Sequence, residues 1–498
     1  MKFSFAALTL APFCAFLLAS CGGGGGSSAT NASAPGSSQA TSTPAATAPF
    51  VEIKFAYEAH RFATRDLVPP YTYAGVNYPG GVADIFPQAS ISLDFEGGRY
   101  PEVIIPLNKA YGTPAYAALP YVLLSNTDGR LRYDPVVNGQ LPSVFGARRA
   151  AALQVAGRPM AFFVAHNVSG SYRDPKAHGT AVLVGQRSGT IGAIANAIPR
   201  LPLKGTLPDD AVDAHSMAAG DINGDGLDDI LIGNWTAFGD GFRPVLLTQQ
   251  PDGRFTATND PFFEQLLSVP MVNPKSEGNE GFNLLLDLHL ADLNGDKFAD
   301  LVAGFGHGST PSLLFLNKNG RFVFNEGVAL PPSVYGIDTN LHMETRSADV
   351  DKDGDLDLLI QHSRYVPYYG GNYLQLLRND RGVFTDITAD ALPQDQSDIR
   401  AARLNWSPDV FIQDLDGDSL KDIVYGLSSG QLLVFFNQGA GRFSRLAATL
   451  PQNQSGRLLA VGDFNADGGP ELLYYQYGGS STEKVYIINA FNLSFKKP

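Results

Sequence analysis

Cysteine is nearly absent from this sequence of 498 residues. The two cysteines, Cys14 and Cys21, both lie close to the N-terminus. The rest of the chain therefore cannot form an internal disulfide bond or a thiolate metal site, and it has no cysteine nucleophile.

Positive charge is also scarce. The chain has 36 Lys and Arg residues against 49 Asp and Glu residues, which gives a net charge of −13. Since it has no basic excess to neutralise phosphates, nucleic acid is not an expected partner. Beyond the N-terminus, no apolar run approaches the roughly 18 residues that a membrane-spanning helix needs.

The first 20 residues have the pattern of an export signal. Lys2 precedes a mostly apolar run that is short for a bilayer span and typical of a secretory signal. The run ends in Leu18-Ala19-Ser20-Cys21, which resembles the bacterial lipobox. That resemblance implies cleavage before Cys21, lipidation of its thiol, and an exported lipoprotein of the outer membrane or cell surface. The alternative is an ordinary signal peptide with a free Cys21.

The segment after Cys21 differs in composition from the rest of the chain. Residues 22–49 are mostly Gly, Ser, Ala, Thr and Pro and contain no charged side chain. Such a segment cannot bury enough apolar surface to offset its chain entropy. We therefore expect a signal peptide over 1–20, a lipidated cysteine with a disordered linker over 21–49, and one folded domain over 50–498.

A nine-residue acidic pattern recurs in the second half of the chain. Asp or Asn stands at positions 1, 3 and 5, and Asp or Glu stands at position 9. The five copies span 221–229, 292–300, 349–357, 414–422 and 463–471. Each is followed by a short apolar run such as Ile230-Leu-Ile232, which predicts a buried strand.

A second signature gives the number of repeats. An apolar strand, a glycine-containing turn and another apolar residue follow one another, as in 314–322, and predict a hairpin. Seven such hairpins are found, near Val122, Val182, Val245, Phe315, Leu376, Phe435 and Tyr486. The first has only a decayed acidic loop before it, 94–102, and the second has none.

These units predict an all-β fold, a seven-bladed β-propeller with calcium-binding loops between strands of several blades. A linear β-solenoid is the competing architecture, but its repeats are shorter and more regular. Either Val51–Tyr57 or Tyr486–Phe495 is expected to supply the strand that closes the ring. The loops and hairpins together resemble the FG-GAP/VCBS repeats of integrin-α-like propellers, from about residue 90 to the C-terminus.

The loop spacing suits a hard cation. Side-chain oxygens at positions 1, 3, 5 and 9 and a backbone carbonyl at position 7 form the oxygen shell that Ca²⁺ prefers. The expected ligands of four to five ions are Asp221, Asn223, Asp225, Leu227, Asp229, Asp292, Asn294, Asp296, Phe298, Asp300, Asp349, Asp351, Asp353, Asp355, Asp357, Asp414, Asp416, Asp418, Leu420, Asp422, Asp463, Asn465, Asp467, Gly469 and Glu471. An EF-hand is excluded because position 12 falls inside the next strand. The alternative for each loop is a turn that needs no metal, above all in the fifth loop and in 94–102.

A ligand site is expected at the rim opposite the loops, according to the same resemblance. The candidate residues are His215, His342, Arg457, Arg364 and Tyr365. Strict alternation along the strands places His215 on the other face from His289 and His342, so unrelated hydrogen-bonded histidines are the alternative. The aromatic insertion 364–373 suits stacking on a sugar or clamping a peptide, or else packing between blades.

No nucleophile elbow, zinc-binding histidine pair, phosphate loop or dinucleotide fingerprint is present. We therefore expect a calcium-stabilised, lipid-anchored surface propeller that binds a protein or carbohydrate partner and contacts the membrane only through its lipid. The alternative is a polysaccharide-active enzyme, a lyase or glycosidase, with its site at the channel rim.

Overall fold

The computed structural model describes residues 50–67, 71–73, 76–78, 85–87, 89–109, 119–141, 143–144, 147–165, 181–187, 190–194, 197–199, 214–234, 244–258, 260–266, 269, 284–306, 310–365, 369–401, 409–427, 431–450, 456–479 and 484–496. The chain divides into two units, Met1–Thr47 and Ala48–Pro498. The predicted signal peptide, Cys21 and the whole of the linker lie outside the described residues.

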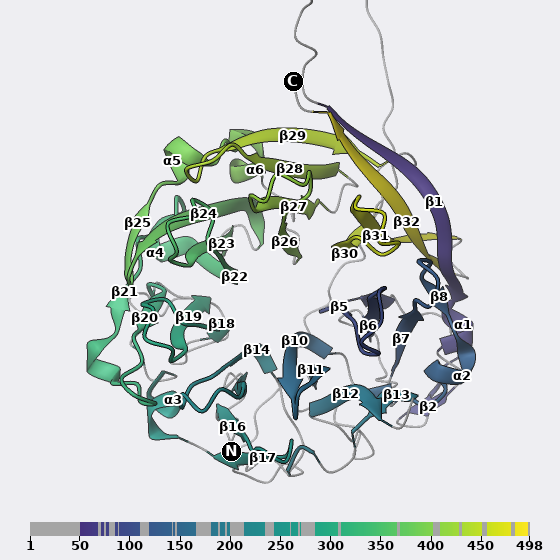
Figure 1. Ribbon diagram of the computed structural model, residues 1–498, viewed down its shortest axis with the longest axis horizontal. Coiled ribbons are helices and arrows are strands. Elements are labelled where there is room, and N and C mark those ends of the chain that lie inside the picture. The colour runs from purple at the N-terminus through teal and green to yellow at the C-terminus, as the bar shows by residue number, and fades with distance from the viewer. Residues whose placement is uncertain are drawn as a thin grey trace, which may run out of the picture. The chain divides into compact units, whose positions relative to one another are not determined.

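The second unit is a ring of seven antiparallel sheets, which confirms the predicted seven-bladed β-propeller (Figure 1). Blade 1 contains β4 (Ile85–Pro87), β5 (Ile91–Leu93), β6 (Glu102–Lys109), β7 (Leu119–Ser125), β8 (Arg132–Tyr133) and β9 (Ser143–Val144). Blade 2 contains β10 (Ala147–Val155), β11 (Arg158–Ala165), β12 (Ala181–Arg187) and β13 (Thr190–Ala193). Blade 3 contains β14 (Ala214–Gly220), β15 (Asp229–Asn234), β16 (Val245–Gln249) and β17 (Phe255–Thr258).

The remaining blades repeat this order from the centre outward. Blade 4 contains β18 (Leu284–Ala291), β19 (Asp300–Gly306), β20 (Leu313–Phe315) and β21 (Val328–Ala329). Blade 5 contains β22 (Asn340–Ala348), β23 (Asp357–Arg364), β24 (Gly370–Asp380) and β25 (Val383–Asp386). Blade 6 contains β26 (Val410–Gln413), β27 (Asp422–Gly426), β28 (Gln431–Asn437) and β29 (Phe443–Thr449).

Blade 7 closes the ring with both ends of the domain. Its strands, from the centre outward, are β30 (Gly456–Gly462), β31 (Glu471–Gly479), β32 (Lys484–Lys496) and β1 (Phe50–Ala63). The two segments that the sequence offered as alternatives are therefore neighbours, since β1 pairs with β32 along its length. This pairing covers the edge that β32 would otherwise expose.

The other elements are short. A separate hairpin joins β2 (Tyr71–Tyr73) and β3 (Val76–Tyr78). The helices are α1 (Thr64–Leu67), α2 (Pro135–Asn138), α3 (Pro261–Leu266), η1 (Phe324–Glu326), α4 (Gly336–Thr339), α5 (Thr388–Ala391) and α6 (Gln396–Arg400). None of the helices described is long and apolar enough to cross a membrane.

The hydrophobic core is divided among the interfaces between blades. Each of the seven interfaces has its own cluster of buried apolar side chains. Strands such as β19 and β27 are buried at every residue because a blade packs on both sides of them. This is why the sequence after each acidic loop is a continuous apolar run rather than an alternating one.

Most inner strands contain a β-bulge. The register against the second strand shifts in β10, β14, β18, β22 and β30, for example between Leu285 and Asp287 and between His342 and Glu344. A bulge changes which side chains face the channel. The strict alternation assumed from the sequence for His215, His289 and His342 therefore does not hold.

Candidate functional site

The five acidic loops share one backbone conformation. They connect the first and second strands of blades 3 to 7. The residues at positions 4 and 6 have positive φ in every loop, including Lys352 (64°) and Ser419 (68°). Only glycine adopts this region without strain, so the non-glycine residues must be held there by the loop.

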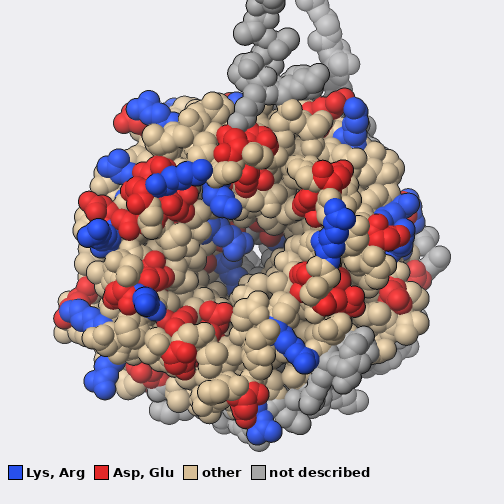
Figure 2. All heavy atoms as spheres, viewed as in Figure 1, with Lys and Arg blue, Asp and Glu red and all other residues tan. Residues whose placement is uncertain are grey.

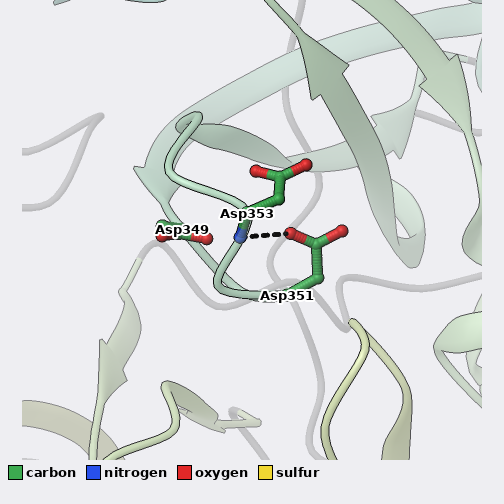
Figure 3. A group of neighbouring side chains, drawn as sticks. All are labelled: Asp349, Asp351 and Asp353. Atoms are coloured by element: carbon green, nitrogen blue, oxygen red, sulfur yellow. Dashed lines mark hydrogen bonds between the residues drawn. The ribbon is translucent and has the colours of Figure 1, made fainter.

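The carboxylate at position 1 organises the turn. In the loop of blade 5, Asp349 accepts hydrogen bonds from the amides of Lys352 (2.7 Å) and Gly354 (3.2 Å). The amide of Asp353 donates to Asp351 Oδ1 at 3.3 Å (Figure 3). The bond between the position 6 amide and position 1 recurs in all five loops, at 2.8–3.2 Å.

The carboxylate at position 9 is buried and links the loop to the blade. Its exposed fraction is 0–3% in all five loops. One oxygen accepts the position 2 amide at 2.7–3.3 Å. In the four aspartates the other oxygen accepts an amide at the end of the third strand, as Asp422 does from Asn437 (2.8 Å). Glu471 instead accepts from the Asn465 side chain (2.9 Å).

Burial raises the pKa of these position 9 carboxylates, and the neighbouring loop carboxylates add to the effect. The pKa rises to about 6 for Asp300, Asp357 and Asp422, and to about 7 for Asp229 and Glu471. Backbone amides oppose this shift without cancelling it. The ionised form of these carboxylates is therefore disfavoured in the metal-free loops.

Two of the loops have carboxylate oxygens close enough together to share a cation. Asp349, Asp351 and Asp353 offer carboxylate oxygens that all lie within 4.8 Å of one another, and so do Asp414, Asp416 and Asp422. Oxygens that share a Ca²⁺ ion at 2.3–2.6 Å can be at most about 5.2 Å apart, so both groups satisfy this limit. The other three loops have an asparagine amide at position 3 in an otherwise similar turn.

The decayed loop of blade 1 keeps part of this arrangement without the full donor set. Glu102 Oε2 accepts the amide of Phe95 at 3.0 Å, in the manner of position 9. Asp94 Oδ1 accepts the amide of Gly98, which replaces the acidic residue of position 5. In blade 2 the loop is reduced to a two-residue turn at Ala156 and Gly157, both with positive φ.

An amide side chain at the end of the third strand joins neighbouring blades. Asn437 Nδ2 donates to the carbonyl of Lys421 in its own loop (3.1 Å) and to that of Val350 in the previous loop (2.7 Å). Asn126, Asn317 and Asn379 make the equivalent pairs of bonds. Each of these loops is thus fixed to the next blade as well as to its own.

A cavity of about 530 Å³ runs along the axis of the ring and is lined by the inner strands of all seven blades. Figure 2 shows basic side chains beside the hollow at the centre. The charged residues that line it are Arg149, Asp287, Glu344, Arg346, Asp409 and Arg457. We call these six residues the channel cluster.

Arg149 crosses the channel from blade 2 to blades 4 and 5. Its Nη2 donates to the carbonyls of Leu286 (2.9 Å) and Met343 (2.8 Å). Its guanidinium lies 3.4 Å from Asp287 Oδ1 and 4.0 Å from Glu344 Oε1. Arg346 Nη2 lies 2.6 Å from the same Glu344 oxygen.

The two buried carboxylates of this group differ in pKa. Burial would raise the pKa of Asp287, but the adjacent His342 and the charge of Arg149 lower it overall. Burial raises the pKa of Glu344 to about 7, against the opposing charges of Arg346 and Arg149.

Sequence reasoning missed most of the channel cluster, although it contains a repeat signal. Asp287, Glu344 and Asp409 each stand five residues before an acidic loop. Arg149 has no such signal because blade 2 has no acidic loop. It meets its partners only when the ring closes.

The predicted rim residues are not brought together. Arg457 lines the channel and forms a bidentate pair with Asp409, at 2.5 and 3.0 Å. His342 does not lie at a rim as predicted. Its side chain is fully buried, and its ring nitrogens are hydrogen-bonded with Ser312 (2.6 Å) and Thr345 (2.7 Å). The backbone of His215 lies in β14, and its side chain lies outside the described residues.

The described residues at the start of the aromatic insertion pack within the fold. Arg364 donates to the carbonyls of Arg400 (3.1 Å) and Ala401 (2.5 Å) after α6, away from the channel lining. Tyr365 is partly buried against an apolar cluster that includes Leu286 and Met343. Arg364 and Tyr365 are therefore not rim residues as predicted. Their contacts agree with the alternative, in which the insertion packs between blades.

Comparisons of the sequence with protein families agree with the loop pattern. The FG-GAP-like repeat model matches residues 292–360 and 414–474, and the FG-GAP repeat model matches residues 214–241. The chain is an FG-GAP-repeat β-propeller. The matched repeats of this FG-GAP propeller lie in blades 3 to 7 and include all five acidic loops.

Solved structures similar to this FG-GAP propeller have low identity. Rhamnogalacturonan lyase YesW is 12% identical with a TM-score of 0.39, covering 88% of this chain and 75% of its own. The BBS1N domain in complex with ARL6DN is 10% identical with a TM-score of 0.39, covering 82% and 93%. The Bacillus licheniformis rhamnogalacturonan lyase PL11 is 11% identical with a TM-score of 0.38, covering 88% and 75%. At these scores the likenesses carry no inference about activity. No curated protein sequence matches the chain.

Proposed function

We propose that this FG-GAP propeller is a calcium-stabilised binding module, attached to the outer membrane or cell surface through a lipid on Cys21. Its central channel binds part of a protein or glycan partner. The observation that carries the proposal is the channel cluster: six charged side chains from five blades meet in one cavity of about 530 Å³. That volume is within the usual range for ligand sites, and convergent polar groups in a concave site favour specific binding.

Calcium belongs to this proposal as a structural cofactor. All five loops provide hard oxygen donors, two of them at the spacing that Ca²⁺ requires, and a bound ion would neutralise the buried position 9 carboxylates. Residues at positions 1, 3, 5 and 9 would hold it. Because the loops connect strands and contact the next blade, the ion would strengthen the ring rather than take part in chemistry.

The binding test uses residues 50–498 in millimolar calcium, applied to an array of surface glycans and to purified envelope proteins. Wild type should bind at least one partner, and Arg346→Ala should bind it at least about tenfold more weakly, since it loses a charged contact. The control is Lys318→Ala, because the Lys318 side chain is exposed to solvent and lies outside the channel lining. Binding that Arg346→Ala leaves unchanged would contradict the channel site.

The anchor has its own test. Full-length protein should fractionate with membranes and take up a labelled fatty acid, and Cys21→Ser should do neither. A membrane-bound Cys21→Ser variant would contradict the lipid anchor.

A polysaccharide-active enzyme is the second candidate, favoured by Glu344. A buried carboxyl that faces a cavity and has a pKa of about 7 is suited to donating or accepting a proton near neutral pH. Release of reducing ends or unsaturated products from polysaccharides, lost in Glu344→Gln, would support this function. If no such product is released from neutral or acidic polysaccharides, the enzyme hypothesis fails and the binding-module proposal stands alone.

A further inference from the structure

The channel contains hydrogen-bond acceptors that no described residue satisfies. Glu344 Oε2 and Gln361 Oε1 are buried and have no hydrogen-bond partner in the described part of the chain. Both residues line the cavity, and they lie opposite each other in the pairing of β22 with β23. Their exposed fractions are 7% and 1%.

A third acceptor is close by. Asp287 Oδ2 makes no hydrogen bond that meets the usual geometry, and the nearest charged partner, His342 Nε2, lies at 3.4 Å. That nitrogen is already 2.7 Å from the hydroxyl of Thr345. Buried acceptors in proteins are rarely left without a hydrogen bond, so three in one cavity indicate a missing donor.

The charges of the cavity limit what this donor can be. The channel cluster has three arginines and three carboxyl groups, so its formal charges cancel. A cation at Glu344 would lie beside Arg346 and Arg149, whose nitrogens are 2.6 and 4.0 Å from its other oxygen. An anion would bring further acceptor oxygens against unsatisfied acceptors. A neutral ligand with several donors avoids both conflicts.

The other lining residues suit a hydroxyl-rich ligand. The wall formed by blades 1 to 3 carries mostly small side chains, such as Ser92, Ala151 and Ala219. Phe411 adds one aromatic ring to the lining. Arg346, whose side chain is 50% exposed, offers guanidinium donors to ligand oxygens. The cavity thus combines free acceptors, a donor and apolar surface.

We propose that the channel binds a neutral sugar ring, whose hydroxyls donate to Glu344 Oε2 and Gln361 Oε1 and accept from Arg346. This assignment rests on the proposed function, because it names the ligand class of the same channel. It distinguishes neutral sugars from uronic acids and amino sugars, which have the same ring but carry a charge.

The experiment is calorimetric titration of residues 50–498 in millimolar calcium. The probes are glucose, galactose and mannose, each with its uronate and its 2-amino form. In at least one series the neutral sugar should bind at least about tenfold more tightly than both charged forms. Preference for a uronate or an amino sugar in every series, or no measurable binding of any probe, would overturn the assignment; in the last case ordered water would satisfy the acceptors.

Variants locate the binding. Gln361→Leu and Glu344→Gln should each weaken the neutral sugar at least about tenfold, since each removes a buried acceptor. Ser92 is exposed on the opposite wall of the cavity. Ser92→Phe should block binding because the larger phenylalanine ring fills the space that the sugar needs. Glu326→Gln, a paired glutamate outside the channel lining, is the matched control and should bind as wild type does.

The two proposals fail in different ways. Sugar affinity that is unchanged in all three channel variants would overturn the channel assignment. A protein or glycan partner that binds through Arg346 while no monosaccharide binds would overturn the sugar assignment and leave the binding module. Calcium-dependent melting of each variant shows that it has folded.

Discussion

The side chain of Asn126 donates a 2.8 Å hydrogen bond to the carbonyl oxygen of Phe464, 338 residues later in the sequence. Asn126 ends the third strand of blade 1, and Phe464 is position 2 of the last acidic loop. The same bond joins blades 3 and 4, 4 and 5, and 5 and 6, so blades 7 and 1 meet through the repeat contact as well as through β1.

Loss of this contact should weaken ring closure. Asn126→Leu leaves the carbonyls of Phe464 and Pro101 buried without their donor. We expect a loss of about 2–4 kcal/mol and a lower melting temperature. Asn325→Leu, at an exposed residue of η1, is the control. Equal melting temperatures for the two variants would show that the bond contributes nothing.

Removal of β1 should be more severe. β1 covers the edge of β32, and its Phe62 packs against Tyr486 with ring centroids 5.4 Å apart. A protein that starts at residue 64 exposes that edge and loses this apolar contact. We expect it to aggregate or melt without a cooperative transition, whereas a protein that starts at residue 50 should melt sharply. Sharp melting of both would refute the closure role of β1.

A single loop should account for a single ion. Asp351→Ala removes the position 3 carboxylate of one of the two closely spaced acidic groups. Bound calcium should fall by one ion per chain, measured by atomic emission, and the calcium-induced rise in melting temperature should shrink. A site saturated a hundredfold above its Kd contributes about 2.7 kcal/mol. The control is Asp380→Ala, an exposed aspartate outside the acidic loops, and an equal ion count in the two variants would argue against this site.

The calcium effect should depend on pH. The position 9 carboxyls have folded pKa values of about 6 to 7 without metal, above the ordinary values of 3.8 for Asp and 4.5 for Glu. The metal-free fold therefore binds protons more tightly than the unfolded chain does, and it loses stability as pH rises from about 4 to 7. Calcium binds the ionised form, so its stabilising effect should grow over the same range.

Metal-free protein, prepared by dialysis against EDTA, is melted with and without calcium at pH 5.5 and 7.5. The difference in melting temperature should be larger at pH 7.5. Equal differences at the two pH values would mean that these carboxyls do not compete with protons for calcium.

The sequence predicted the parts of the fold that each repeat specifies locally. The acidic loop, the apolar run that follows it and the hairpin are short-range patterns, and each of the seven predicted hairpins lies at the third strand of one blade. Even blade 2 was found, although its loop is only Ala156 and Gly157.

Features that depend on contacts across the ring could not be predicted in this way. The bulge beside His342 breaks the strict alternation that was used to place the histidines on opposite faces, and the His342 side chain is buried rather than at a rim. Arg149 contacts Asp287 only because the inner strands of blades 2 and 4 line the same channel, on either side of blade 3. Position 9 was predicted only as a metal ligand, yet Asp422 also accepts two backbone amides that fix the loop to its blade.

The most direct test of the account is thermal unfolding of residues 50–498, free of metal and in millimolar calcium, with bound calcium counted by atomic emission. We expect four to five ions per chain and a large calcium-dependent rise in the melting temperature. No bound calcium and no change in melting would contradict it, because the acidic loops would then be turns held by their own hydrogen bonds.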